Sequence, residues 1–151
     1  MFYFIIAIVL LLDQGSKAAV QMMMYQGESI PIVKKVFHLT YILNPGAAFG
    51  FLAHQTNLFI IVTLVLVLGV LLFYRRLPLE RALLRYGLAL IVGGALGNLV
   101  DRLRFGRVVD FLDFRIWPVF NLADSAIVIG ACLLILDFLK DATQKPDKES
   151  G

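Results

Sequence analysis

Residues 82–100, ALLRYGLALIVGGALGNLV, form an almost unbroken apolar stretch that is followed at once by Asp101. A helix that crosses a bilayer needs about 20 mainly apolar residues. Gly93, Gly94 and Gly97 give this stretch the small-residue spacing that lets two membrane helices approach closely. The stretch therefore predicts a membrane-spanning helix that packs against a neighbour and ends beside a charged group.

Three further stretches have the length and composition of membrane spans, at residues 2–24, 58–74 and 120–139. The chain has 151 residues, of which 60% are hydrophobic and 17% charged, with a mean hydropathy of +0.83. A soluble core of this size cannot bury so much apolar surface. The first stretch has no basic residue before its apolar run, so we expect a retained helix and not a signal peptide. The sequence predicts an all-α polytopic membrane protein with four transmembrane helices.

The basic residues give the expected orientation, because short cytoplasmic loops carry an excess of Lys and Arg. The numbers of basic residues on the two faces are nearly balanced, but the second loop is compact and carries Arg75, Arg76, Arg81 and Arg85, so we place this loop and both termini in the cytoplasm. Residues 1–140 are expected to form one membrane domain, followed by a polar, disordered cytoplasmic tail at residues 141–151. The net charge of +3 is too small to indicate nucleic acid binding.

The first loop, residues 29–52, differs from the spans because it mixes β-branched and aromatic residues in partial alternation. Pro45, Gly46 and Gly50 then favour a turn. We expect a small extracytoplasmic β-sheet here, a β-cradle, that forms one wall of a site. The third loop, residues 101–119, is the other candidate wall.

Polar residues of the spans are expected to converge at this outer end. Successive spans run in opposite directions, so the end of the third meets the start of the fourth. Asn98, Asp101 and Arg102 share one face of the third helix because they are three and four residues apart. The residues that we expect to meet there are Asp13, Lys17, Asn44, Asn98, Asp101, Arg102, Asp110, Asn121 and Asp124.

Asp110 and Asp124, in the motifs VVDFLDF and FNLADS, stand at the edges of apolar sequence where ionised carboxylates are costly. If folding brings them within a few ångströms, they share a proton and can act as acid and base on one water molecule. That is the arrangement of an aspartic protease. It needs no cofactor, and His38 and His54 lack a partner at zinc-ligand spacing, so no metal is predicted.

Simpler interpretations exist for single residues. Asp13 and Lys17 have the spacing of an intrahelical ion pair. Asp113 reads as a solvated loop carboxylate, and Cys132 reads as a buried packing residue.

Two other functions also remain open: a small transporter or ion-binding protein that uses intramembrane Asp residues, and a structural membrane scaffold. The lack of a repeat and of a polar path across the membrane argues against the transporter.

Five motifs, DQGSK, YILNPGAAFG, GGALGNLVDR, GRVVDF and FNLADS, follow one another over residues 13–130. Together they resemble the bacterial lipoprotein signal peptidase family, also called signal peptidase II. The resemblance implies an integral membrane aspartic endopeptidase that removes signal peptides from prolipoproteins, cutting before a cysteine that carries diacylglycerol. It also implies four transmembrane helices and a small extracytoplasmic β-cradle.

The resemblance carries roles to individual residues. It implies Asp110 and Asp124 as the catalytic pair, and Asn44 and Arg102 as contacts to the substrate backbone. Asp101 is a rival for the second acid, but we prefer Asp110 because Arg102 makes Asp101 a charge-paired support. The stretch between VVDF and NLAD is shorter than is usual for the family. The supporting residues are Asp13, Lys17, Asn98, Asp101, Asn121 and Ala123.

The implied partners are lipidated prolipoprotein substrates and membrane lipid, with no nucleic acid and no obligate protein partner. The implied location is the bacterial cytoplasmic membrane, with the active site at its extracytoplasmic face. The sequence does not assign the shared proton to either aspartate.

Overall fold

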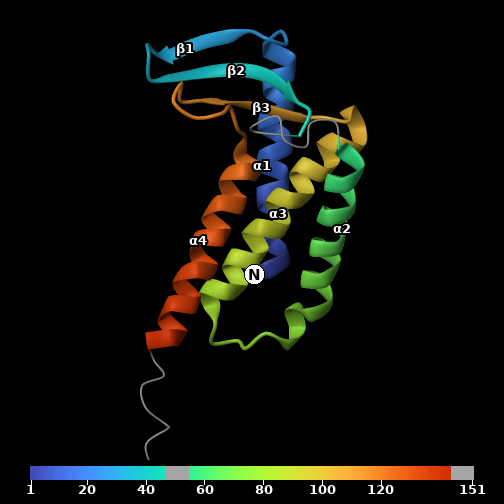
Figure 1. Ribbon diagram of the computed structural model, residues 1–151, viewed down its shortest axis with the longest axis vertical. Coiled ribbons are helices and arrows are strands. Elements are labelled where there is room, and N and C mark those ends of the chain that lie inside the picture. Colours follow the sequence, from blue (N-terminus) through green and yellow to red (C-terminus); the bar gives the residue numbers. More distant parts are fainter. Residues whose placement is uncertain (47–54, 144–151) are drawn as a thin grey trace, which may run out of the picture.

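The computed structural model describes residues 1–46 and 55–143 of the chain, and its main feature is a bundle of four long helices (Figure 1). Each helix is long and apolar enough to cross a membrane. The helices are α1 (Phe2–Met23), α2 (Thr56–Phe73), α3 (Ala82–Phe105) and α4 (Leu122–Thr143). The predicted fold of four transmembrane helices is confirmed.

Two of the helices are longer than the sequence indicated. α3 continues to Phe105 instead of residue 100, and α4 continues to Thr143 instead of residue 139. Polar residues at these ends can remain helical because they lie beyond the apolar span. α4 thus includes residues 141–143, which the sequence analysis assigned to the tail, and residues 144–151 lie outside the described residues.

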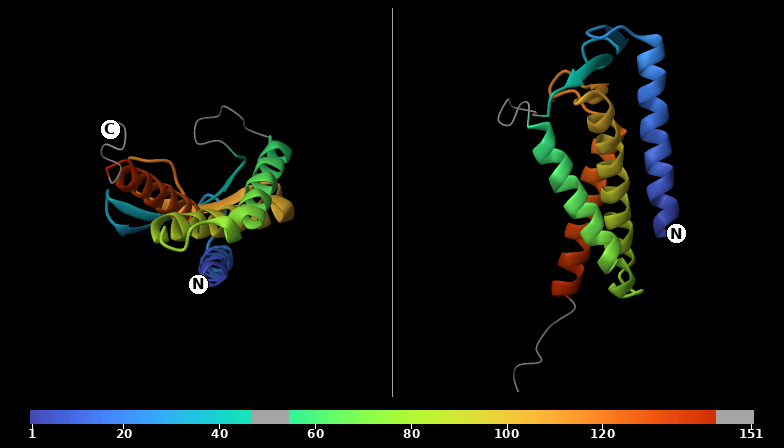
Figure 2. Two further views of the ribbon diagram at one scale, coloured as in Figure 1. Left: turned by 90° about the horizontal axis from the view of Figure 1, so that it is seen from below. Right: turned by 90° about the vertical axis from the view of Figure 1, so that its right-hand side faces the viewer.

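α3 is the central helix, and α1, α2 and α4 each pack against it (Figure 2). Its glycines explain the close approach of its neighbours. A Cβ atom at Gly87 would lie 2.7 Å from the carbonyl oxygen of Gly130 in α4. A Cβ atom at Gly93 would lie 2.8 Å from Cβ of Val9 in α1. The small-residue spacing in α3 thus fixes the positions of two other helices.

A short 3₁₀ turn, η1 (Tyr74–Arg76), follows α2 at the end of the bundle away from the sheet. Phe2 stacks on Tyr74 with 3.6 Å between the ring centroids, which joins the start of α1 to this turn. Arg81 forms an ion pair with Asp137 and so joins the start of α3 to α4. These contacts hold the helix ends together on this side.

A three-stranded antiparallel sheet covers the other end, in the order β1 (Ser29–Val33), β2 (Phe37–Asn44) and β3 (Val108–Asp113). The first two strands confirm the sheet that was predicted in the first loop. The third strand comes from the third loop, which the sequence indicated as a wall but not as a strand. The backbone of Gly106 is left-handed, with φ of 67°, so the chain leaves α3 and enters β3 after a very short turn.

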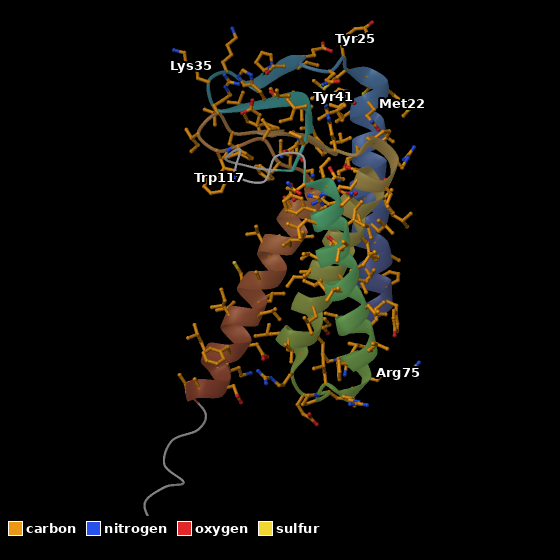
Figure 3. The ribbon with its side chains drawn as sticks, turned by 45° about the vertical axis from the view of Figure 1, so that its right-hand side comes forward. Met22, Tyr25, Lys35, Tyr41, Arg75 and Trp117 are labelled. Atoms are coloured by element: carbon orange, nitrogen blue, oxygen red, sulfur yellow. The ribbon has the colours of Figure 1, made fainter. Side chains whose placement is uncertain are left out.

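An apolar cluster fixes the sheet to the bundle. Val20 and Met24, at the end of α1, pack against Tyr41 of β2 and against Val109 and Phe111 of β3. Figure 3 shows Tyr41 beside the end of α1, whereas Lys35, in the turn between β1 and β2, lies at the far edge. This packing sets the height of β3 above the helix ends.

Two single-residue expectations were wrong. Asp113 is buried, because β3 extends to this residue and Thr40 of β2 donates a 2.7 Å hydrogen bond to it. Arg115 also forms an ion pair with Asp113. Cys132 is exposed on α4. The predicted roles of Gly50 and His54 concern positions outside the described residues.

Candidate functional site

A cavity of about 250 Å³ lies where the end of α3, the start of α4 and strands β2 and β3 meet. Both predicted catalytic aspartates line it, together with Asn98 and the two predicted substrate contacts. The remaining wall comes from the loop between β3 and α4; Figure 3 shows Trp117 of this loop beneath the sheet. The lining residues are Asn44, Gly46, Asn98, Arg102, Val108, Asp110, Trp117, Pro118, Val119, Phe120 and Asp124.

Asp124 stands in the first turn of α4 and is tied to Asn121, the residue just before the helix. The Asn121 backbone N–H donates to Oδ2 of Asp124 over 3.3 Å, and the Asp124 N–H donates to Oδ1 of Asn121 over 2.9 Å. This is the reciprocal pattern of a capping box. Asn98 of α3 donates to Oδ1 of Asp124 over 2.7 Å. A carboxylate is favoured here because a helix N-terminus carries partial positive charge.

Asp110 lies in the middle of β3, and only 2% of it is exposed. The side-chain amides of Asn121 and Asn44 donate to its two oxygens over 2.6 and 2.8 Å. Burial, and then the charge of Asp124, raise the pKa of Asp110 to about 7. The two amide donors and the charge of Lys17 act in the opposite direction but do not cancel this rise. Asp110 can therefore hold a proton near neutral pH.

Asn121 bonds to both carboxyl groups, to that of Asp110 through its side chain and to that of Asp124 through its backbone N–H. It is fully buried, its side-chain oxygen accepts the N–H of Asp124, and its side-chain nitrogen donates to Asp110. The same nitrogen lies 3.1 Å from Oδ1 of Asn98. Asn121 thus fixes the relative orientation of the two acids, which is a more specific arrangement than the helix cap that its position alone would indicate.

A buried charge cluster lies behind the cavity. The ammonium group of Lys17 is 2.8 Å from Oδ2 of Asp13 and 2.8 Å from Oδ2 of Asp101. It also donates to Oδ1 of Asn98 over 3.0 Å. The intrahelical pair of Asp13 and Lys17 is present as predicted, but Asp101 makes it a triad between α1 and α3. Asp13 also accepts the backbone N–H of Ala123, which brings the last supporting residue into the cluster.

The two predicted substrate contacts, Asn44 and Arg102, both line the cavity. The guanidinium carbon of Arg102 is 4.8 Å from the centroid of the Phe59 ring, a cation–π distance. The oxygen of Asn44 accepts the backbone N–H of Gly46 over 2.9 Å. This bond and the bond to Asp110 hold the Asn44 amide at the cavity wall, and among the described residues its second N–H donor has no partner.

Some residues of the site were missed by the sequence analysis. Gln14 donates to Asp13, Asp101 and the carbonyl oxygen of Gly97, and its place inside the motif DQGSK could have indicated this. Trp117 could have been found as an aromatic residue at a membrane interface. No local signal places Phe59 next to Arg102, because that contact depends on how α2 packs.

The arrangement is suited to proton transfer. Two carboxyl groups line one cavity, and Asp110, whose pKa is raised to about 7, can hold a proton near neutral pH, so one group can donate a proton while the other accepts one. Within residues 1–46 and 55–143, no group of three or more His, Cys, Asp or Glu side chains is placed to hold a metal ion.

The chain was compared with known proteins. Residues 5–140 match the family described as Signal peptidase (SPase) II. A lipoprotein signal peptidase of Pelotomaculum thermopropionicum is 61% identical over 97% of each chain, and one of Moorella thermoacetica is 53% identical over 95% of this chain and 96% of its own. A solved bacterial membrane enzyme superposes with a TM-score of 0.90 at 32% identity, over 99% of this chain and 94% of that chain.

The helices and these similarities define a multi-pass bacterial membrane protein of the peptidase class. The chain belongs to the signal peptidase II family.

Proposed function

We propose that this protein is an aspartic endopeptidase that removes the signal peptide from prolipoproteins, cutting before the diacylglyceryl-modified cysteine. The observation that carries the proposal is that Asp110 and Asp124 line one cavity and are bridged by Asn121. The names of the relatives support the substrate class, since they are lipoprotein signal peptidases.

Asp124 is assigned as the ionised base and Asp110 as the acid. The raised pKa of Asp110, about 7, supports this assignment, as does the position of Asp124 at a helix N-terminus. Asp124 takes a proton from water while the water oxygen attacks the scissile carbonyl carbon, and Asp110 donates its proton to the carbonyl oxygen. When the C–N bond breaks, Asp124 gives its proton to the leaving nitrogen and Asp110 recovers its own.

Asn44 and Arg102 are assigned to the substrate backbone. The free N–H of Asn44 and the guanidinium donors of Arg102 face the cavity from opposite elements, β2 and α3. Hydrogen bonds from both sides would hold an extended peptide across the two acids. Such positioning lowers the orientational part of the reaction barrier.

An apolar groove of about 500 Å³ supports a substrate that carries acyl chains, because it adjoins the cavity and shares Asp124, Trp117 and Phe120 with it. Val128 and Ile129 of α4 line it on the side of the bundle that would face lipid. A lipid-anchored cysteine held at this depth would present the preceding peptide bond to the acids.

The active site is assigned to the extracytoplasmic face, and both termini are assigned to the cytoplasm. The positive-inside rule supports this orientation, because Arg75 and Arg76 lie at the end of the bundle opposite the sheet, as Arg75 does in Figure 3. Residues 1–140 are assigned to a single membrane domain.

The test is cleavage of a lipidated precursor in detergent by Asp110→Asn and Asp124→Asn, each assayed alone. Both variants should lose turnover while keeping the thermal stability of a folded protein. Asp137→Asn is the matched control, since Asp137 is a buried aspartate of α4, the helix of Asp124, but lies at the other end of that helix, so the variant should stay active. Full activity in either test variant would remove that residue from the pair. Asp124-dependent ion flux in proteoliposomes without cleavage would favour a transporter.

A further inference from the structure

All three hydrogens of the Lys17 ammonium group are committed. Two point to the carboxylates of Asp13 and Asp101, and the third points to the oxygen of Asn98. The side chain is 2% exposed, so water does not compete for these contacts. Lys17 has no donor left for a ligand, and its contacts within the protein must account for its position.

The two carboxylates that flank Lys17 each accept a backbone N–H from another element. Asp13 accepts the N–H of Ala123 over 2.9 Å, and Asp101 accepts the N–H of Val109 over 3.0 Å. Ala123 directly precedes Asp124, and Val109 directly precedes Asp110. Each carboxylate therefore holds the backbone of one catalytic aspartate at the preceding residue.

We infer that Asp13, Lys17 and Asp101 form a clamp that sets the separation of the Asp110 and Asp124 carboxyl groups. Asp13 connects the clamp to α4, Asp101 connects it to β3, and Lys17 joins the two carboxylates. This assignment makes all three positioning residues, and it rests on the proposed catalytic pair.

The geometry distinguishes this clamp from a simple staple between α1 and α3. A contact that only joined α1 to α3 would need the ion pairs and nothing more. Here Oδ2 of Asp101 accepts both Lys17 and Val109, so β3 cannot move away from α3 without disturbing a buried ion pair. Gln14 adds a further bond to each carboxylate, which restricts their rotation.

A looser clamp would alter how the two acids titrate. Asp110 is faced by Asp124 from α4, by Arg102 from α3 and by Lys17 from α1. The charge of Asp124 helps Asp110 to keep its proton. If β3 moves away from α4, that effect weakens and Asp110 ionises at lower pH. The alkaline limb of the pH–rate profile therefore reports the separation of the pair.

The test compares Asp101→Asn with Asp101→Leu in the full-length protein, using single-turnover cleavage of a lipidated precursor in detergent over a range of pH. Both variants remove the same charge, but only the amide keeps an oxygen for Lys17 and Val109. Asp101→Asn should cleave within about tenfold of the parental rate, and the alkaline limb of its pH–rate profile should stay at the same pH. Asp101→Leu should cleave about 100-fold more slowly with little change in KM, and its alkaline limb should move to lower pH.

Asp137→Asn and Asp137→Leu are the controls, because they repeat the same exchange in an ion pair at the other end of the bundle. Both should leave the pH profile unchanged. If Asp101→Leu is not recovered folded, Asp13→Asn and Asp13→Leu give the corresponding comparison for the connection to Ala123.

Two results would overturn the inference. The first is an identical pH profile and rate for the Asn and Leu variants. The second is an Asp101→Asn protein with unchanged thermal stability and no turnover, which would make Asp101 a catalytic acid. The Asp110→Asn and Asp124→Asn assays test the proposed catalytic pair separately, because activity in either variant would contradict that pair. In that case the thermal stabilities of Asp101→Leu and Asp101→Asn decide whether the clamp holds β3. Equal stabilities would overturn it.

Discussion

α2 and α3 are neighbouring spans with opposite surroundings. α2 is the most apolar of the four helices, yet Val67 is the only buried residue within residues 56–73, all of which are described. α3 is among the least apolar, yet nine of its residues are buried, including Asn98 and Asp101. In this protein the more hydrophobic helix faces lipid and the more polar helix forms the core.

The different surroundings of α2 and α3 follow from the lipid that acts as the solvent of a membrane helix. Lipid tails are as apolar as leucine, so burying a leucine against protein gains little in a membrane. Packing contacts and hydrogen bonds decide instead which helix lies inside. α3 has glycines that let Gly130 and Val9 approach its backbone, and it has polar groups that lipid would not tolerate.

The largest expected effect comes from making the end of α3 resemble α2. Asn98→Leu removes the donor to Asp124 and the acceptor for Lys17. We expect cleavage of a lipidated precursor to fall at least about 100-fold, the scale observed when a preorganised donor is deleted. Thr63→Leu in α2 is the matched exchange and should cleave at the parental rate. Similar rates for the two variants would contradict the contrast between the helices.

The glycines provide the next largest effect. Gly87→Ala would place Cβ 2.7 Å from the Gly130 carbonyl oxygen, whereas a Cβ at Gly69 of α2 meets nothing within 4 Å. Overpacking of this kind costs about 1–3 kcal/mol. Thermal unfolding in detergent should show a lower melting temperature for Gly87→Ala and no loss for Gly69→Ala. Equal melting temperatures would mean that α3 and α4 can separate without cost.

The pH dependence is expected to follow Asp110, which faces the polar end of α3. With a pKa of about 7, Asp110 is protonated below that pH and ionised above it. Only the protonated form can donate to the carbonyl oxygen. kcat/KM should therefore decrease about tenfold per pH unit above neutrality. A profile that stays flat to pH 9 would show that Asp110 is not the acid.

The smallest effect is expected at the opposite end of α3, where Arg81 pairs with Asp137. Arg81 is partly exposed, so the pair is screened and its loss should cost below about 1 kcal/mol. Asp137→Asn should lower the melting temperature slightly and leave kcat unchanged. A large loss of activity would show that the two ends of the bundle are coupled.

Much of the fold could be predicted from local sequence. Spans are found from composition, because the length of an apolar run is fixed by the thickness of the bilayer. The strands at residues 29–33 and 37–44 also followed from β-branched and aromatic residues. The third strand did not, since VVDFLD at residues 108–113 pairs with β2 across a long separation in sequence. Asp113 was misjudged for the same reason.

The residues of the site also fall into those that the sequence predicted and those that depend on tertiary packing. Motifs predicted which residues converge, and the cavity contains Asn44, Asn98, Arg102, Asp110 and Asp124. Their roles as catalytic and substrate-binding residues remain predictions. Phe59 could not be placed, because its contact with Arg102 depends on the packing of α2 against α3.

The sequence by itself determined the number of spans, the end at which polar groups gather, and the family to which the chain belongs. Those properties depend on composition and on motifs that can be read along one dimension. Only the tertiary structure decided that Asn121 bridges the two acids and that two backbone amides are held by carboxylates of other helices. Hydrogen bonds act over about 3 Å, so the packing of helices distant in sequence decides which of them form.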